Sequence, residues 1–257
     1  MSDAKITGTP YVVGGIRVSF AVPDTITGGL VSYWRFNEGS GAVAADSIGG
    51  HTAAVGQPPA NLNGCWDNTS GSCLTSYFDG TNFYAARVAT GSYYNTNSLT
   101  IFFWGANGGH LSQIYFSHAD TGFNQQSWIV QNGTADNTLM EVKLSSDGVT
   151  TDKDYTTSVQ ANFGAYNWHS FAFTFDGSTS ALKLYVDGIR DGSPAITANN
   201  PISSLFNSPA DITFAIGLSS GAYVGSGINR ALRQFRFYNV VKTDAQILAI
   251  HNLGSTY

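Results

Sequence analysis

Residues 168–188 read WHSFAFTFDGSTSALKLYVDG, and this stretch decides the fold class. Phe171, Phe173 and Phe175 alternate with other side chains, so that in a β-strand they would share one face. Residues 182–186 repeat this alternation, and the Asp-Gly that follows is a signal for a tight hairpin turn. The stretch therefore predicts neighbouring antiparallel strands with one face turned towards a core.

Short apolar segments of the same kind recur along the whole chain, each bounded by Gly, Asn, Asp or Ser, which favours strands joined by turns. They comprise residues 11–22, 30–36, 99–104, 128–130, 139–144, 212–216 and 234–238. One helix is predicted from Thr243 to Leu253, because Thr243 and Gln246 have the spacing of a capping box and Gly254 can end the helix. The pattern predicts an all-β jelly-roll sandwich of two antiparallel sheets with one short C-terminal helix.

The charge and hydropathy of the chain exclude two classes of partner. Its 257 residues carry 12 basic and 17 acidic side chains, without a basic cluster of the kind that neutralises phosphates. No apolar run approaches the roughly 20 residues that a membrane-spanning helix needs. We therefore expect neither nucleic-acid binding nor membrane insertion.

A series of motifs along the chain carries a resemblance to a known family. The motifs are GLVSYWRFNEGSG at 29–41, ADS at 45–47, FDGTNFY at 78–84, LTIFFW at 99–104, WHSFAFTFDG with LKLYVDG within 168–188, and FRFYN at 235–239. Together they resemble the laminin-G-like domains of the concanavalin A-like lectin/glucanase superfamily. The resemblance covers residues 29–254 and implies a jelly-roll sandwich. We therefore divide the chain into an N-terminal arm, residues 1–28, and a laminin-G-like domain, residues 29–257.

This resemblance implies a binding or adhesion module with glycans as its ligands, although relatives with the same sandwich include glycosidases. A retaining glycosidase needs two carboxyl groups about 5–5.5 Å apart. The chain contains two Glu, Glu38 and Glu141, and neither has a second acid at the spacing that such enzymes use. We therefore expect a non-catalytic protein. A glycoside hydrolase whose carboxyl groups meet only in space is the alternative.

Sugar binding needs exposed aromatic faces beside short polar side chains, because sugars present apolar C–H faces and hydroxyl groups. Tyr93 and Tyr94 lie among Gly, Ser and Asn, so we expect both to be exposed and to contact the ligand. Trp66 and Asn124 lie in two further polar loops and complete the predicted ligand-binding set. Ordinary loop residues or a protein–protein interface are the alternatives.

Two further features concern metal and sulfur chemistry. The resemblance implies a calcium ion held by Asp46 and by an acid before the last strand, where this chain has Gln234. Gln234 offers only a neutral oxygen, and a turn-capping role for Asp46 is the alternative. Cys65 and Cys73 flank a short polar segment, which favours a local disulfide over two free thiols.

The arm, residues 1–28, is too apolar for a free solvated tail, and residues 16–22 alternate as a strand does. This strand would add to the edge of the domain's own sheet, or to a neighbouring chain and so form a homo-oligomer. Residues 1–4 lack the features of a secretory signal, so we expect a protein made in a cytoplasm and used at a virion surface or in an extracellular setting. There it would be a glycan-binding decoration or fibre component of a phage particle, or a purely structural virion protein partnered by coat protein.

Overall fold

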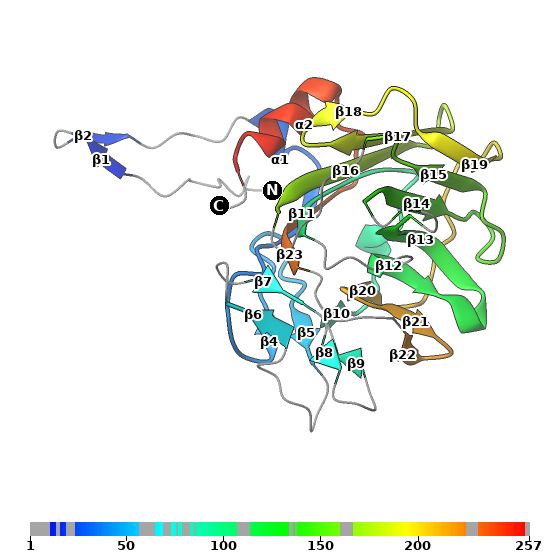
Figure 1. The fold of residues 1–257 in the computed structure, drawn as a ribbon, viewed down its shortest axis with the longest axis horizontal. Coiled ribbons are helices and arrows are strands. Elements are labelled where there is room, and N and C mark those ends of the chain that lie inside the picture. Colours follow the sequence, from blue (N-terminus) through cyan, green and yellow to red (C-terminus); the bar gives the residue numbers. More distant parts are fainter. Residues whose placement is uncertain are drawn as a thin grey trace.

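The structure, a computed structural model, describes residues 11–13, 16–18, 24–56, 65–68, 73–75, 77–78, 83–84, 86–106, 114–133, 136, 138–159, 167–224 and 231–254. In these residues two sheets of antiparallel strands face one another across a hydrophobic core, and a short C-terminal helix lies on the outer side of one sheet (Figure 1). The predicted fold class, an all-β sandwich with one short C-terminal helix, is confirmed.

The larger sheet supplies one wall of the sandwich. Its strands, in hydrogen-bonding order, are β19 (Ala195–Asn199), β15 (Lys153–Thr156), β14 (Met140–Leu144), β13 (Gln125–Asn132), β12 (Ile114–Asp120), β20 (Ile212–Phe214), β10 (Ala86–Val88), β5 (Ala53–Val55) and β4 (Val43–Ala44). The hairpin of β21 (Gly217–Ser219) and β22 (Ala222–Val224) joins this sheet through a parallel contact between β21 and β12.

The smaller sheet supplies the other wall. Its strands are β18 (Ile189–Arg190), β17 (Ala181–Val186), β16 (His169–Asp176), β11 (Ser98–Ala106), β23 (Ala231–Tyr238), β7 (Cys73–Leu74) and β6 (Trp66–Asp67), with β3 (Leu30–Trp34) paired to β23. Four further elements are the hairpin strands β8 (Tyr77–Phe78) and β9 (Phe83–Tyr84) and the helices α1 (Asp24–Thr27) and α2 (Asp244–His251).

The stretch that decided the fold forms β16, β17 and β18. The three Phe of β16 are at most 2% exposed and belong to the core between the sheets. Phe175 lies opposite Leu182 on β17, as the alternation predicts. Asp187 and Gly188, between β17 and β18, both have positive φ angles, 49° and 77°, which a two-residue hairpin turn of type I′ requires.

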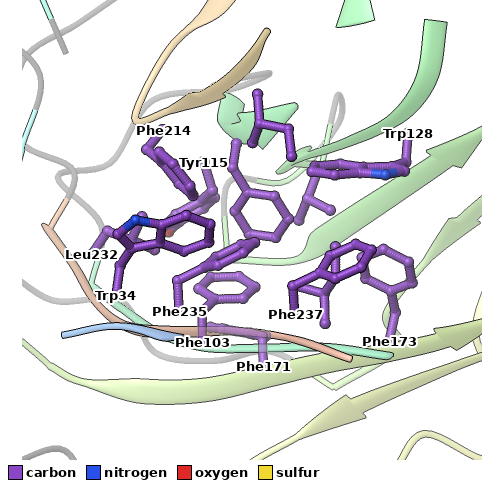
Figure 2. Close-up of a cluster of buried hydrophobic side chains, with 14 of the residues drawn as sticks. Trp34, Phe103, Tyr115, Trp128, Phe171, Phe173, Phe214, Leu232, Phe235 and Phe237 are labelled. Carbon is purple, nitrogen blue, oxygen red and sulfur yellow. The ribbon is translucent and has the colours of Figure 1, made fainter. Parts of the chain in front are cut away.

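Aromatic side chains from both sheets interlock in the core (Figure 2). Phe235 of β23 is fully buried, and its ring centroid lies 5.8 Å from that of Trp34 on the same sheet. Across the sandwich it lies 4.7 Å from Phe116 and 5.0 Å from Phe214, both nearly edge-on. Such aromatic pairs contribute about 0.5–1.5 kcal/mol each beyond the burial of their surface. Phe235 therefore joins the two sheets directly.

A β-bulge in β23 determines which of its side chains reach this core. The register between β23 and β11 shifts between Phe102 and Trp104, and Gln234 adopts a φ of 52°. The extra residue lets Leu232 and Phe235, three positions apart, both face inward.

The predicted C-terminal helix begins with the predicted capping box. Thr243 Oγ1 accepts a hydrogen bond from the backbone N–H of Gln246 at 3.3 Å, and Gln246 Oε1 accepts one from the N–H of Thr243 at 2.9 Å. Ile247 and Ile250 then pack with Phe102 on the outer face of the smaller sheet. Neither described helix is long and apolar enough to cross a membrane.

The arm contains two short strands, β1 (Tyr11–Val13) and β2 (Ile16–Val18), where one was predicted. They pair with each other, with Val13 opposite Ile16, and in the described residues neither strand is hydrogen-bonded to a sheet of the sandwich. Whether the arm adds to the domain's own sheet or to a neighbouring chain stays a prediction. The rest of the predicted strand, residues 19–22, lies outside the described residues.

Replacing Phe235 by Ala tests the contact between the sheets. We expect Phe235→Ala to lower the free energy of unfolding by about 3–5 kcal/mol, because it leaves a cavity among three other rings. Urea titration measures this change, and Val149→Ala, at a position that is 56% exposed, should change stability by less than about 0.5 kcal/mol. A loss below about 1 kcal/mol for Phe235→Ala would contradict the assignment.

The buried His118 of β12 predicts a loss of stability in acid. Its side chain is fully buried with Nε2 3.1 Å from Thr90 Oγ1, and this burial lowers the pKa of the imidazole from 6.5 to about 4. Between pH 6.5 and about pH 4 the His118 imidazole is therefore protonated in the unfolded chain and neutral in the folded chain. The free energy of unfolding should fall by about 3 kcal/mol from this group as the pH drops from 6.5 to 4.

Urea unfolding of the wild type and of His118→Gln at pH 7 and pH 4 measures that contribution. The variant should lose about 3 kcal/mol less than the wild type on acidification, because glutamine does not titrate. Equal losses in the two proteins would show that the folded state accepts the proton on His118.

Candidate functional site

Tyr93 forms the exposed aromatic surface that the sequence predicts. It lies in a single turn of 3₁₀ helix, η2 (Ser92–Tyr94), after β10, and is 37% exposed. Its ring stacks on the imidazole of His51, with the ring centroids 3.8 Å apart and 16° between the planes. We call this pair the Tyr93–His51 surface.

Two glycines leave the room that this stack needs. A Cβ atom on Gly91 would lie 2.4 Å from the Tyr93 ring, and one on Gly49 would lie 2.4 Å from the His51 ring. A side chain at either position would therefore displace the ring beside it. Gly49 is also close to the backbone, because its Cβ would lie 2.4 Å from the carbonyl oxygen of Val31.

Tyr94, the neighbouring residue, faces the interior. It is 2% exposed, its hydroxyl lies 3.2 Å from Ser32 Oγ, and its ring contacts Trp34 and Phe237. The expected exposure is therefore confirmed for Tyr93 and wrong for Tyr94. Successive residues of a short helical turn point in different directions, so one of two adjacent tyrosines reaches the core and supports the other from below.

The carboxylate of Asp46 holds the loop that carries His51. Its side chain is fully buried, and Oδ1 accepts hydrogen bonds from the backbone N–H of Tyr33 at 2.8 Å and of Ile48 at 3.0 Å. Oδ2 accepts one from the backbone N–H of His51 at 3.2 Å and lies 3.1 Å from His51 Nδ1. The indole N–H of Trp34 donates to the carbonyl oxygen of His51 at 2.8 Å. The loop is thus fixed to the core at several points.

The residues implied as calcium ligands do not fit a calcium ion. Calcium takes oxygen ligands, whereas the Asp46 carboxylate is surrounded by N–H donors. Gln234 donates its amide N–H to the carbonyl oxygen of Gly254 at 3.0 Å. The described residues contain no group of three or more His, Cys, Asp or Glu side chains placed to hold a metal.

Trp66 and Asn124, the other predicted ligand residues, lie apart from the Tyr93–His51 surface. Trp66 is 6% exposed, belongs to the core, and donates its indole N–H to the carbonyl oxygen of Gly41 at 2.9 Å. Asn124 is exposed and ends a second 3₁₀ turn, η3 (Thr121–Phe123), with a left-handed φ of 56°. No contact joins either residue to Tyr93. Trp66 is therefore part of the core, while Asn124 is exposed on a different loop.

Two carboxyl groups do meet in space, on the face of the larger sheet that points away from the core. Glu141 of β14 accepts a hydrogen bond from Gln131 Nε2 at 2.6 Å and lies 3.4 Å from Lys143 Nζ. Asp154 of β15 lies near Glu141, and burial, together with the charge of Glu141, raises the pKa of Asp154 to about 6. The sequence analysis missed this pair because cross-strand register brings the residues together.

Ser32, His51 and Asp46 also lie together without forming a nucleophilic relay. In a Ser-His-Asp triad the serine and the carboxylate contact different nitrogens of the imidazole. Here Ser32 Oγ lies 2.8 Å from Nδ1 of His51, and Asp46 Oδ2 lies 3.1 Å from the same nitrogen. Ser32 is also fully buried, so the geometry positions a ring and does not activate a nucleophile.

The predicted disulfide is absent, and Cys65 and Cys73 are both free. In the β6–β7 hairpin Cys73 lies opposite Asp67, so the two cysteines are not direct cross-strand partners. Cys65 belongs to the main core, whereas Cys73 packs with Ala106 and Ala231 in a separate cluster. Burial raises the pKa of the Cys65 thiol to about 11 and that of Cys73 to about 12.

Comparison with known proteins places this geometry in a family. The family model of the concanavalin A-like lectin/glucanases superfamily matches residues 79–248. No curated protein matches the sequence.

Several solved structures share the fold at low sequence identity. The binding domain of botulinum neurotoxin serotype D/C VPI 5993 gives a TM-score of 0.61 at 15% identity, over 90% of this chain and 53% of that one. The binding domain of Paraclostridial Mosquitocidal Protein 1 gives 0.62 at 12% identity, over 89% and 53%. Botulinum neurotoxin type C, which depends on interaction with two ganglioside molecules to enter cells, gives 0.62 at 15% identity, over 90% and 53%. The chain thus spans about half the length of these structures, and the likeness is one of fold.

Alkylation of the two thiols checks the correction of the disulfide. At pH 8 the folded protein should resist a thiol reagent, because both thiols are buried and their raised pKa values leave little thiolate. In urea without reductant, intact-mass measurement should show both cysteines labelled. An unlabelled protein under those conditions would restore the disulfide.

Proposed function

We propose that this chain, which belongs to the concanavalin A-like lectin/glucanase superfamily, is a non-catalytic module that binds glycans through the Tyr93–His51 surface. The observation that carries the proposal is the partly exposed Tyr93 ring, stacked on His51 at 3.8 Å and fixed from below. A rigid ring at the surface presents apolar area for the C–H face of a sugar at little cost in entropy. The exposed Asn95 and Asn97, which follow in the chain, supply amide groups for hydroxyls.

The solved structures of similar fold support glycans as the ligand class. They include a receptor-binding domain and binding domains of toxins, and one of those toxins depends on gangliosides, which are lipids with a glycan headgroup. This chain shares the sandwich with them at 12–16% identity, so its own binding residues have to be argued from its own surface. The Tyr93–His51 surface is our assignment of that site.

The geometry of the described acids favours binding over hydrolysis. The superfamily includes glucanases, so a carboxyl pair deserves comparison with theirs. Glu141 is engaged by Gln131 Nε2 at 2.6 Å and by Lys143 Nζ at 3.4 Å, so its carboxylate is committed to contacts within the sheet. Display of the module on a phage particle, and a purely structural role in a virion, stay predictions from the sequence on which the glycan proposal does not depend.

A glycan array with matched variants tests the proposal. Wild-type protein should bind a defined set of glycans, and Tyr93→Ala should weaken that binding about tenfold or more, which corresponds to the loss of about 1.4 kcal/mol. Phe123→Ala is the control, because Phe123 is a 57% exposed aromatic residue in the other 3₁₀ turn. Both variants should keep the melting temperature of the wild type within a few degrees.

Two results would contradict the proposal. If the wild type binds nothing on a broad array, the module is not a lectin. If Phe123→Ala loses binding while Tyr93→Ala keeps it, glycans bind at the η3 loop near Asn124 and not at the Tyr93–His51 surface.

A further inference from the structure

The described residues of the arm form a two-stranded hairpin. β1 and β2 pair only with each other in the described residues, with Tyr11 opposite Val18 and Val12 opposite Arg17. A lone two-stranded hairpin is marginally stable in water and gains stability when a further strand pairs with its edge. The sequence of β1, Tyr-Val-Val, carries no charge, whereas β2 contains Arg17. The β1 edge is therefore the one open to another strand.

The sandwich presents one long strand edge of its own. β19 is the last strand of the larger sheet on one side, and among the described residues it pairs only with β15. Three other terminal strands, β4, β18 and β6, end after two residues, and short edges of this kind discourage strand addition. The five-residue β3 is also terminal, but the Asp46 carboxylate and the N–H of Ser47 occupy its outer side at Tyr33. β19 runs for five residues, AITAN, without a charge or a proline, and its Ile196 is 52% exposed. Its regular pairing is interrupted by a bulge at Thr197, where the register with β15 shifts.

These two edges lie far apart in one chain. Figure 1 shows the hairpin on one side of the molecule and β19 on the opposite side. Residues 19–23 connect β2 to α1, and five residues span at most about 18 Å. So short a connection keeps the hairpin near α1, on the side of the molecule away from β19 (Figure 1). A hairpin and an edge that lie at opposite ends of one molecule are, however, well placed to join two molecules.

We propose that the β1 edge of one copy of this chain adds to β19 of a second copy. Main-chain hydrogen bonds would extend the larger sheet, and the hairpin would cover the exposed Ile196. Because the two partner surfaces differ, the contact is head-to-tail and each copy keeps one free edge. Association therefore continues beyond a dimer. An assembly of this kind would display several Tyr93–His51 surfaces together and raise the avidity of a weak glycan site.

Two point variants in the full chain separate the two halves of this contact. The alternation of pairs in an antiparallel ladder directs the backbone N–H of Val12 to the free edge, so Val12→Pro removes a donor from the hairpin edge. Ile196→Lys places a charge on the β19 edge, a device that blocks strand addition. Val149→Lys is the control, because Val149 is also apolar and 56% exposed but lies between β14 and β15.

Analytical ultracentrifugation over a range of concentrations reads the result without any glycan. Wild type and Val149→Lys should form species larger than dimers that grow with concentration, and each edge variant alone should be monomeric. A mixture of Val12→Pro and Ile196→Lys should form one-to-one heterodimers and nothing larger, because one intact hairpin then meets one intact β19.

The proposal is wrong if the wild type stays monomeric, if either edge variant assembles as the wild type does, or if the mixture stays monomeric. Hydrogen exchange of wild-type residues 195–199 is a second measurement that needs no variant, and protection there should rise with concentration. Failure of assembly leaves the array result untouched, so this proposal and the glycan proposal fail separately.

Discussion

The buried carboxylate of Asp46 is the contact on which the candidate site depends. It accepts backbone N–H groups from β3 and from its own loop, and it lies 3.1 Å from His51 Nδ1. Hydrogen bonds to a charged group contribute about 1.5–3 kcal/mol each, which is enough to hold a glycine-rich loop in one conformation. The loop contains His51, and the imidazole of His51 stacks on the ring of Tyr93. A single aspartate thus connects the sheet, the core and the exposed ring.

The sequence predicted the fold well because the fold depends on local patterns. The alternating Phe of β16, the Asp187-Gly188 turn and the Thr243 capping box each work within a few residues. It predicted the site in part, because polar loop composition marks Tyr93 but cannot separate it from the buried Tyr94. Contacts that depend on cross-strand register could not be predicted from the sequence. The bulge at Gln234 and the proximity of Glu141 and Asp154 both follow from strand pairing. The two cysteines illustrate the same limit, since they are close in sequence and yet belong to different clusters.

Two acidic side chains of the sandwich, Asp46 and Glu141, are held by contacts within the protein. Asp46 saturates its oxygens with N–H donors, and Glu141 is held by Gln131 and Lys143. A catalytic acid or base has to reach the substrate with a hydrogen bond, whereas a binding surface needs a rigid shape. Tyr93 has the second property. Strand addition between copies would display several Tyr93–His51 surfaces together and so raise the avidity for a glycan.

The central claim is that the Tyr93–His51 surface is where a glycan binds. Side-chain NMR of the wild type, titrated with a soluble fragment of the best array ligand, tests this location most directly. The account predicts that the His51 imidazole and Tyr93 ring signals shift together and saturate with one affinity, while signals of Trp128 on the core side of β13 stay in place. Shifts centred on Glu141, Lys143 and Asp154, with the His51 signals unchanged, would contradict it and move the site to the outer face of the larger sheet.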